Sequence, residues 1–183
     1  ASDVYKRQDR VHAVGGHIVV DGVSYAPHGL PDVAALDCDI YLYSTYKTYG
    51  PHVGLMYTRR SLLEQMTNQG HYFKDTTPEG WLTPAGPDHA AIGSVAGIAD
   101  YYDTLVAHHG IEGTTSRDRV ASLFAAFAAH EAEITAPLVE MLIAHDRARL
   151  VGAPTVDQAV RAPTVAFHVP GTTSASILSL IHI

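Results

Sequence analysis

Two reactive side chains each follow a short apolar segment of this chain. Asp21 comes directly after the apolar residues 17–20, and Lys47 follows the apolar run 40–43 by a few residues. Both runs are typical of buried strands, and in an open α/β sheet ligands bind at the carboxyl ends of strands. An amine can form an imine with an aldehyde, and a carboxylate stabilises a protonated nitrogen heterocycle. Together at one sheet edge, the two groups would suit an aromatic aldehyde whose ring nitrogen carries a proton.

Pyridoxal phosphate (PLP) is a cofactor that needs both groups. Lys47 would form the Schiff base and Asp21 would keep the pyridine nitrogen protonated, so that the ring stabilises a carbanion at Cα of an amino acid. The hydroxyls of Ser44 and Tyr46 flank Lys47 and are candidates for binding the phosphate. The released Lys47 amine could then move protons at Cα. Taken singly, a lysine after a strand is also typical of a solvated surface, and Asp-Gly of a turn.

The composition is that of a globular protein and argues against several function classes. Hydrophobic residues make up 46% of the 183 residues and the formal net charge is −7, so we expect a folded chain with no surface for nucleic acid. No apolar run reaches the roughly 18 residues of a membrane span. The single cysteine, Cys38, favours a reducing cytoplasm and is interpreted as a buried structural thiol. The twelve histidines have no paired ligand spacing, so no metal site is predicted.

The two ends of the chain are related in an unusual way. Residues 3–8 could be encoded by one DNA sequence and residues 178–183 by its reverse complement, as expected for a transposase adapter read through in frame. We therefore interpret residues 1–8 and 178–183 as adapter-derived tails that do not inform the fold. What lies between is expected to be an internal fragment of a longer protein.

The residue pattern predicts strands and loops in the first half of the chain and mainly helices in the second half. Pro87 favours the start of a helix and Gly110 its end. Thr115 and Asp118 form a capping box for a longer helix, which Pro137 should kink. The remaining predictions are strands near residues 17–20, 40–44, 53–58, 149–151 and 164–169, a short helix over 59–66 and an irregular segment over 67–86.

Four sequence blocks together resemble a known family. They are residues 21–28 (DGVSYAPH), 32–39 (DVAALDCD), 44–54 (STYKTYGPHVG) and 82–89 (LTPAGPDH). In these blocks the chain resembles the class V aminotransferases of PLP fold type I, and most of all their cysteine desulfurase-like branch. The resemblance covers roughly residues 17–110 well and the rest loosely.

The resemblance implies roles for five residues. Lys47 is the Schiff-base lysine, Asp21 is the partner of the ring nitrogen, and Ser44 matches a phosphate-binding serine. Tyr46 stands where many desulfurases have a phosphate-contacting histidine. Ser24 stands where a glutamine often contacts the ring hydroxyl.

The resemblance also implies that parts of the family's site lie outside this stretch of sequence. The family's phosphate loop and stacking aromatic residue normally precede the position of Asp21, and its catalytic cysteine and substrate-binding arginine normally follow the position of the last residue. Cys38 is not that cysteine. Residues 83–86 match a segment that each subunit of the family's dimer lends to its partner. His28 and His52 lie near the proposed site, either as loop and packing residues or as contacts to cofactor or substrate.

The fold class implied is α/β, namely part of a PLP fold type I large domain, a mostly parallel sheet with helices, followed by the start of a small α+β domain. Residues 9–110 would be the C-terminal part of the large domain and residues 111–177 the start of the small one. The implied function is that of a PLP-dependent transferase or lyase that acts on an amino acid, a small-molecule substrate, by desulfuration or transamination, as a homodimer in the full-length parent. The alternative is a truncated, non-catalytic fragment that does not bind PLP by itself.

Overall fold

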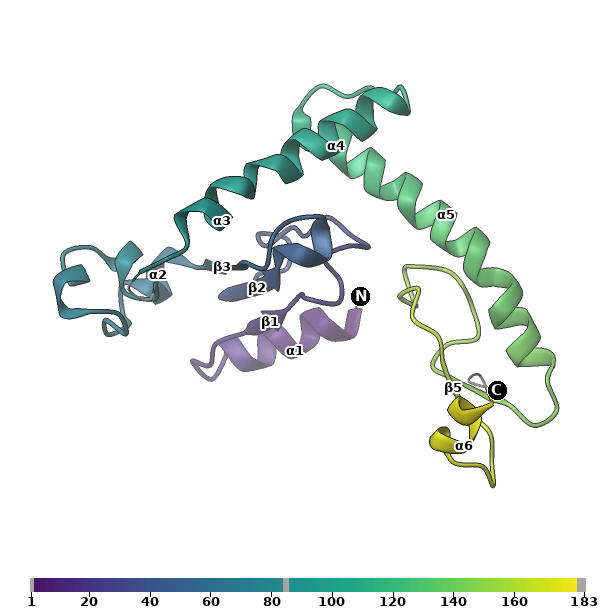
Figure 1. The fold of residues 1–183 in the computed structure, drawn as a ribbon. Helices are drawn as coiled ribbons and strands as arrows, with labels where there is room; N and C mark the ends of the chain where they lie inside the picture. Colours follow the sequence, from purple (N-terminus) through teal and green to yellow (C-terminus); the bar gives the residue numbers. More distant parts are fainter. Residues whose placement is uncertain (1, 84–85, 181–183) are drawn as a thin grey trace. The chain divides into compact units, whose positions relative to one another are not determined.

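The computed structural model describes residues 2–83 and 86–180, which form two compact units that divide within one long helix. The first unit comprises residues 2–123 and the second begins at Phe124. The elements of the first unit are α1 (Ser2–His12), β1 (Val19–Asp21), β2 (Ile40–Ser44), η1 (Thr45–Thr48), β3 (Gly54–Thr58), α2 (Arg60–Leu63), η2 (Tyr72–Lys74), η3 (Pro78–Gly80), α3 (His89–Ser94) and α4 (Ala96–His108). Figure 1 labels its α-helices and its strands.

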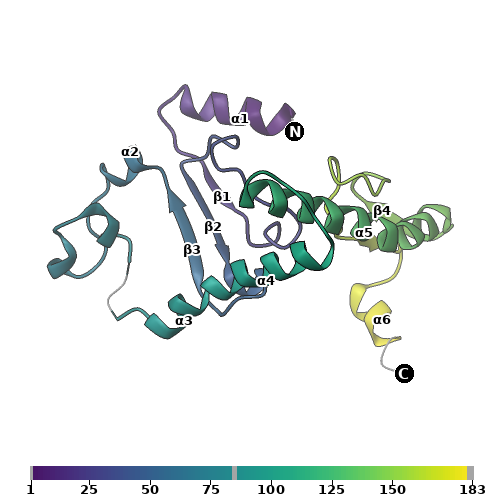
Figure 2. The same cartoon turned by 90° about the horizontal axis from the view of Figure 1, so that it is seen from above.

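A three-stranded sheet in the order β1-β2-β3 lies at the centre of the first unit. β1 and β2 run parallel with Asp21 opposite Leu42, whereas β3 runs antiparallel to β2 with Gly54 opposite Ser44. Because β1 and β2 are parallel, both end at the same edge of the sheet. In Figure 2, α1 lies near the end where these strands begin and α4 near the end where β2 finishes.

A network of charged groups ties α1 to the beginning of β2. The buried Asp39 carboxylate accepts a hydrogen bond from Ile18 N at 2.8 Å, lies 3.0 Å from His12 Nε2, and lies 3.2 Å from Arg59 Nε. Burial by itself raises the pKa of Asp39, but the hydrogen bonds from Ile18 and His12 and the charge of Arg59 outweigh it, so the pKa lies below its ordinary value. The network therefore fixes the end of the sheet opposite to the predicted site.

The segment predicted to be an adapter-derived tail is helical from Ser2 onward, as part of α1. The Gln8 side chain donates a hydrogen bond to the Leu36 carbonyl, and His12 of the same helix lies against Asp39. A single helix can include residues of either origin, so the adapter interpretation stays a prediction. Of the other predicted tail, residues 181–183 lie outside the described residues, as does Ala1 of the first.

Cys38 is fully buried at the entry to β2, at 0% exposure. Its sulfur lies 3.9 Å from the Val33 carbonyl oxygen. Burial raises the pKa of this thiol, because a low-dielectric surrounding disfavours the thiolate. These observations confirm that Cys38 is buried, and its structural role stays a prediction.

The predicted helices after residue 86 are present, with one difference. The structure has two helices, α3 and α4, where one was predicted, and they meet at Val95. Gly93 and Gly97 flank this point, and glycine weakens a helix because of its conformational freedom. Asp88 caps α3 by accepting a hydrogen bond from Ala91 N at 2.9 Å. Gly110 adopts a φ of +61° just after α4, as its predicted role at a helix end requires.

The predictions for residues 59–86 were only partly right. The helix predicted over 59–66 is confined to α2, and hydrogen-bonded turns continue to Met66. The segment predicted to be irregular contains the short helices η2 and η3. Each of these helices is a single turn. Residue periodicity does not reveal such an element, because one turn has too few residues to show a period.

The second unit contains most of α5 (Ser116–Ala144) together with β4 (Arg149–Val151), β5 (Ala166–His168) and α6 (Ser174–Ser179). The predicted capping box is present at the start of α5, since Thr115 and Asp118 exchange backbone-to-side-chain hydrogen bonds of 2.9 and 3.1 Å. The helix continues through Pro137. β4 and β5 pair antiparallel, close to the predicted ranges. The predicted domain boundary after residue 110 stays a prediction.

None of the helices in the described part of the chain combines the length and apolar character needed to cross a membrane. Among residues 2–83 and 86–180, no three histidine, cysteine or acidic side chains gather in a group that could hold a metal ion.

Candidate functional site

The candidate site lies where β1 and β2 end. Asp21 is the last residue of β1 and pairs with Leu42 of β2, and Ser44 lies two residues further along β2. Side chains alternate between the two faces of a strand, so Asp21, Leu42 and Ser44 share one face of the sheet. The parallel register therefore brings the acid and the serine to the same face of the same edge.

Asp21 is exposed and its carboxylate begins the turn that follows β1. Its Oδ1 accepts a hydrogen bond from Val23 N at 3.0 Å. Asp21 also lines a cavity of about 400 Å³ together with Gly22, Tyr25 and Tyr41, a volume within the range of small-molecule sites. Among the described lining residues, Asp21 is the one predicted site residue; Ser24, Ser44, Tyr46 and Lys47 do not line this cavity.

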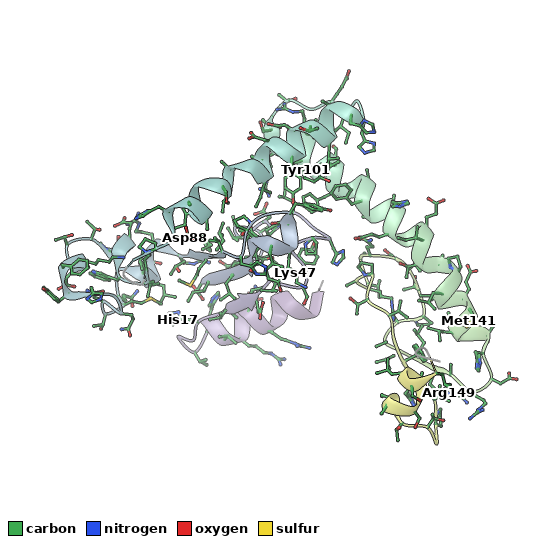
Figure 3. The ribbon with its side chains drawn as sticks, viewed as in Figure 1. His17, Lys47, Asp88, Tyr101, Met141 and Arg149 are labelled. Atoms are coloured by element: carbon green, nitrogen blue, oxygen red, sulfur yellow. The ribbon has the colours of Figure 1, made fainter. Side chains whose placement is uncertain are left out.

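Lys47 projects from η1, directly after β2, and Figure 3 labels it there. Its side chain is exposed, and its Nζ lies 5.3 Å from the centroid of the Tyr46 ring. Ser44 is the N-cap residue of η1 and makes no side-chain capping hydrogen bond, so its hydroxyl is not used by the helix it precedes. Ser24 is exposed in the turn after Asp21.

Thr45 closes the loop that bears Lys47. It is fully buried, and its hydroxyl donates to the Pro51 carbonyl at 2.6 Å and lies 3.1 Å from the Val53 carbonyl. Its backbone N–H donates to Val53 O at 2.9 Å, and its carbonyl accepts from Gly50 N at 2.9 Å. The loop from residue 45 to 53 is thus hydrogen-bonded across its base.

Helix α4 supports the same loop. The Tyr49 ring lies 4.8 Å from that of Tyr101 and 6.4 Å from that of Tyr102, measured between centroids. A Cβ added to Gly50 would lie 2.6 Å from Ile98 Cδ1, so only glycine permits this approach without rearrangement. Burial raises the pKa of Tyr102 to about 12. Figure 3 shows Tyr101 and Lys47 on the neighbouring elements α4 and η1.

No role is predicted for Thr45 from the residue pattern, and for His52 the pattern allows either packing or ligand contact. The structure shows that the His52 ring stacks on the Tyr46 ring, with centroids 4.7 Å apart and planes inclined by 18°. A threonine beside a serine and a tyrosine gives no signal of its own, because its burial depends on residues that follow it in the loop. The Gly50-Pro51 turn was the one local sign that His52 returns toward Tyr46.

Comparison with known proteins identifies the family. The profile described as Aminotransferase class-V matches residues 2–182. The chain belongs to the class V aminotransferase family. The aminotransferase-like protein FGM3 of Gibberella zeae is 33% identical over 175 residues, which cover 94% of this chain and 40% of that protein. The cysteine desulfurase-like protein ustD of Aspergillus flavus is 30% identical over 173 residues, which cover 92% of this chain and 36% of that protein.

Solved structures show the same fold. The cysteine desulfurase CsdA of Escherichia coli superposes with a TM-score of 0.66 at 20% identity, covering 98% of this chain and 42% of that one. The predicted α/β class is thereby confirmed. The resemblance to the cysteine desulfurase-like branch is confirmed by the match to the ustD protein. This class V aminotransferase chain spans about two fifths of the length of the relatives it matches.

Proposed function

We propose that this chain supplies the acid and lysine part of a PLP site, and that the intact protein is a transferase or lyase acting on an amino acid. Membership of the class V aminotransferase family supports the proposal. The structural observation that supports it most is the parallel pairing of β1 and β2, since both strands end at the edge where Asp21 and η1 lie.

The residues present have the chemistry that this cofactor needs: a carboxylate, an amine and hydroxyls at one sheet edge. When bound, PLP would supply an electron-withdrawing ring that stabilises negative charge at Cα of an amino acid. Asp21 would hold a proton on the ring nitrogen, since its negative charge favours the cationic form. Lys47 would bind the aldehyde carbon through Nζ and, once displaced by the substrate, would take up or deliver the proton at Cα.

The remaining predicted residues would orient the cofactor. The hydroxyls of Ser44 and Tyr46 would donate hydrogen bonds to the phosphate, as their positions on either side of Thr45 allow. Ser24, in the turn after Asp21, would face the ring hydroxyl. We also propose that the intact protein is a cytoplasmic homodimer in which residues 83–86 reach the partner's site; of these, Pro84 and Ala85 lie outside the described residues.

The proposal is tested by adding PLP to the purified chain and recording its absorption spectrum. A band at about 420 nm is expected for the lysine-bound cofactor. Lys47→Ala should abolish this band, whereas Lys74→Ala should leave it in place. A band that survives in Lys47→Ala would remove Lys47 from its role. A band that appears in the longer parent protein but not in this chain would support the alternative that the fragment does not hold PLP by itself.

A further inference from the structure

The Tyr46 ring has two neighbours of different kinds. The His52 ring stacks on it at 4.7 Å, and the Lys47 ammonium lies 5.3 Å from its centroid. Tyr46 is 43% exposed and Lys47 is exposed as well, so the surrounding core does not fix either side chain. A lysine side chain has four rotatable bonds, and its amine samples a wide volume unless a contact restricts it.

The loop places His52 where it can restrict the Tyr46 ring. His52 follows Pro51, whose carbonyl accepts the buried hydroxyl of Thr45 at 2.6 Å, and it precedes Val53, whose carbonyl accepts Thr45 N at 2.9 Å. The backbone on both sides of His52 is therefore tied to the residue just before Tyr46. A ring held in this way limits the rotation of the ring stacked on it.

We infer that His52 is a positioning residue for Lys47 and acts through Tyr46. The stack holds the Tyr46 ring in one orientation, and the ring face attracts the Lys47 ammonium through a cation–π contact, which for an exposed pair corresponds to an occupancy preference of about 2- to 5-fold. The consequence for the cofactor rests on the proposed function. A Lys47 side chain held beside the carboxyl end of β2, once its ammonium has given a proton to the solvent, meets an aldehyde there more often than a freely moving one.

Proton NMR of the chain labelled with ¹³C-lysine tests the contact without any cofactor. The lysines are Lys6, Lys47 and Lys74, so few signals arise, and Lys47→Arg assigns the one of interest. The Lys47 Cε protons are expected upfield of the other two because of the ring current of Tyr46. His52→Ala should move them to the position of a free lysine and His52→Phe, which restores a stacked ring, should return them.

A matched control exists elsewhere in the chain. His71 stacks on Phe73 with centroids 4.9 Å apart and planes inclined by 16°, and His71→Ala should leave the Lys47 signal unchanged. A Lys47 signal that is not shifted in the unaltered chain, or that is the same with and without the His52 ring, overturns the inference.

Labelling by PLP tests the consequence. Each lysine amine condenses with the aldehyde with loss of one water, and borohydride then delivers hydride to the C=N bond, leaving a stable secondary amine that mass spectrometry assigns to a lysine. Lys47 should carry most of the label, and its share relative to Lys6 and Lys74 should fall about 2- to 5-fold in His52→Ala and recover in His52→Phe.

The two measurements separate the two proposals. Labelling without preference for Lys47 in the unaltered chain would contradict the proposed function. The NMR shift would still show whether the Lys47 side chain contacts the Tyr46 ring. If His52→Ala removes the upfield shift of the Lys47 protons but leaves the share of label on Lys47 unchanged, the positioning role of His52 is overturned.

Discussion

Asp39 is the residue at which burial and charge oppose each other most directly. Its side chain is 8% exposed and its partners come from three segments: His12 of α1, Ile18 before β1 and Arg59 after β3. A buried carboxylate without such partners would be costly. With these three partners, the Asp39 carboxylate connects α1, the start of β1 and the end of β3 to the beginning of β2.

Replacement of Asp39 by asparagine should therefore destabilise the first unit. The loss of charge-assisted hydrogen bonds is expected to lower the free energy of unfolding by about 1–3 kcal/mol near pH 5. Because the pKa of Asp39 is lower in the folded chain than the ordinary 3.8, its stabilising contribution is present above that value and disappears as the pH falls through the folded pKa.

Urea unfolding of the two proteins at several pH values measures this difference. The difference in the free energy of unfolding should begin to narrow as the pH falls below about 3.8 and should close once the pH is below the folded pKa of Asp39. Asp103→Asn, at an exposed position of α4, is the control and should change little. A gap that persists undiminished at low pH would show that the charge is not the cause.

At the scale of elements, the loop 45–53 depends on one side chain. Thr45 connects the end of β2 to Pro51 and Val53, just before β3, and so sets where η1 and Lys47 lie. The antiparallel pairing of β2 with β3 continues this connection, since Ser44 lies opposite Gly54. The position of Lys47 is thus a property of the hairpin rather than of Lys47 itself.

Thr45→Val keeps the shape of the side chain and removes its hydroxyl. We expect a loss of about 1–2 kcal/mol in the free energy of unfolding and faster hydrogen exchange at Gly50 N, which donates to the Thr45 carbonyl. Thr104→Val, which removes an exposed hydroxyl bonded to the Asp100 carbonyl at 2.8 Å, is the matched control and should not alter exchange at Gly50. Equal exchange in both variants would contradict the role given to Thr45.

The helices and strands were predicted from the pattern of residues with mixed success. The strand predicted over residues 40–44 matches β2, and the predicted capping box of α5 is present, because a side chain caps its own local backbone. The cap of α3 at Asp88 was not predicted. The helix predicted over 59–66 was too long, and the break at Val95 was missed. Ends of elements depend on which backbone groups find partners in the tertiary fold, and composition alone does not specify that.

For the molecule as a whole, the open side of β1 is the feature with the clearest consequence. In the described sheet β1 is an edge strand, and Val19 on it is 59% exposed. An apolar edge strand presents unpaired backbone groups that favour association with other chains. The chain spans about two fifths of the length of its relatives, and in this 183-residue form we expect the edge to promote self-association.

Val19→Lys should therefore reduce association, because charge on an edge strand opposes strand pairing. Sedimentation velocity at increasing protein concentration measures the effect, with a smaller shift toward larger species expected for the variant. Val14→Lys adds the same charge at a position that is 83% exposed in the turn after α1, and it should associate like the unaltered chain. An equal reduction by both variants would point to net charge instead of the strand edge.

The sequence by itself determined which groups could do chemistry, where most strands and helix caps lie, and, through four short blocks, the class V aminotransferase family. These features are local, since a side chain's reactivity, a cap or a strand's alternation depends on near neighbours along the chain. Only the tertiary structure decided that Thr45 is buried beneath the loop, that His52 stacks on Tyr46, that α4 supports Tyr49, and that the cavity beside Asp21 is not lined by Lys47. Each of these depends on contacts and packing that form only when the loop closes or when segments distant in the sequence meet.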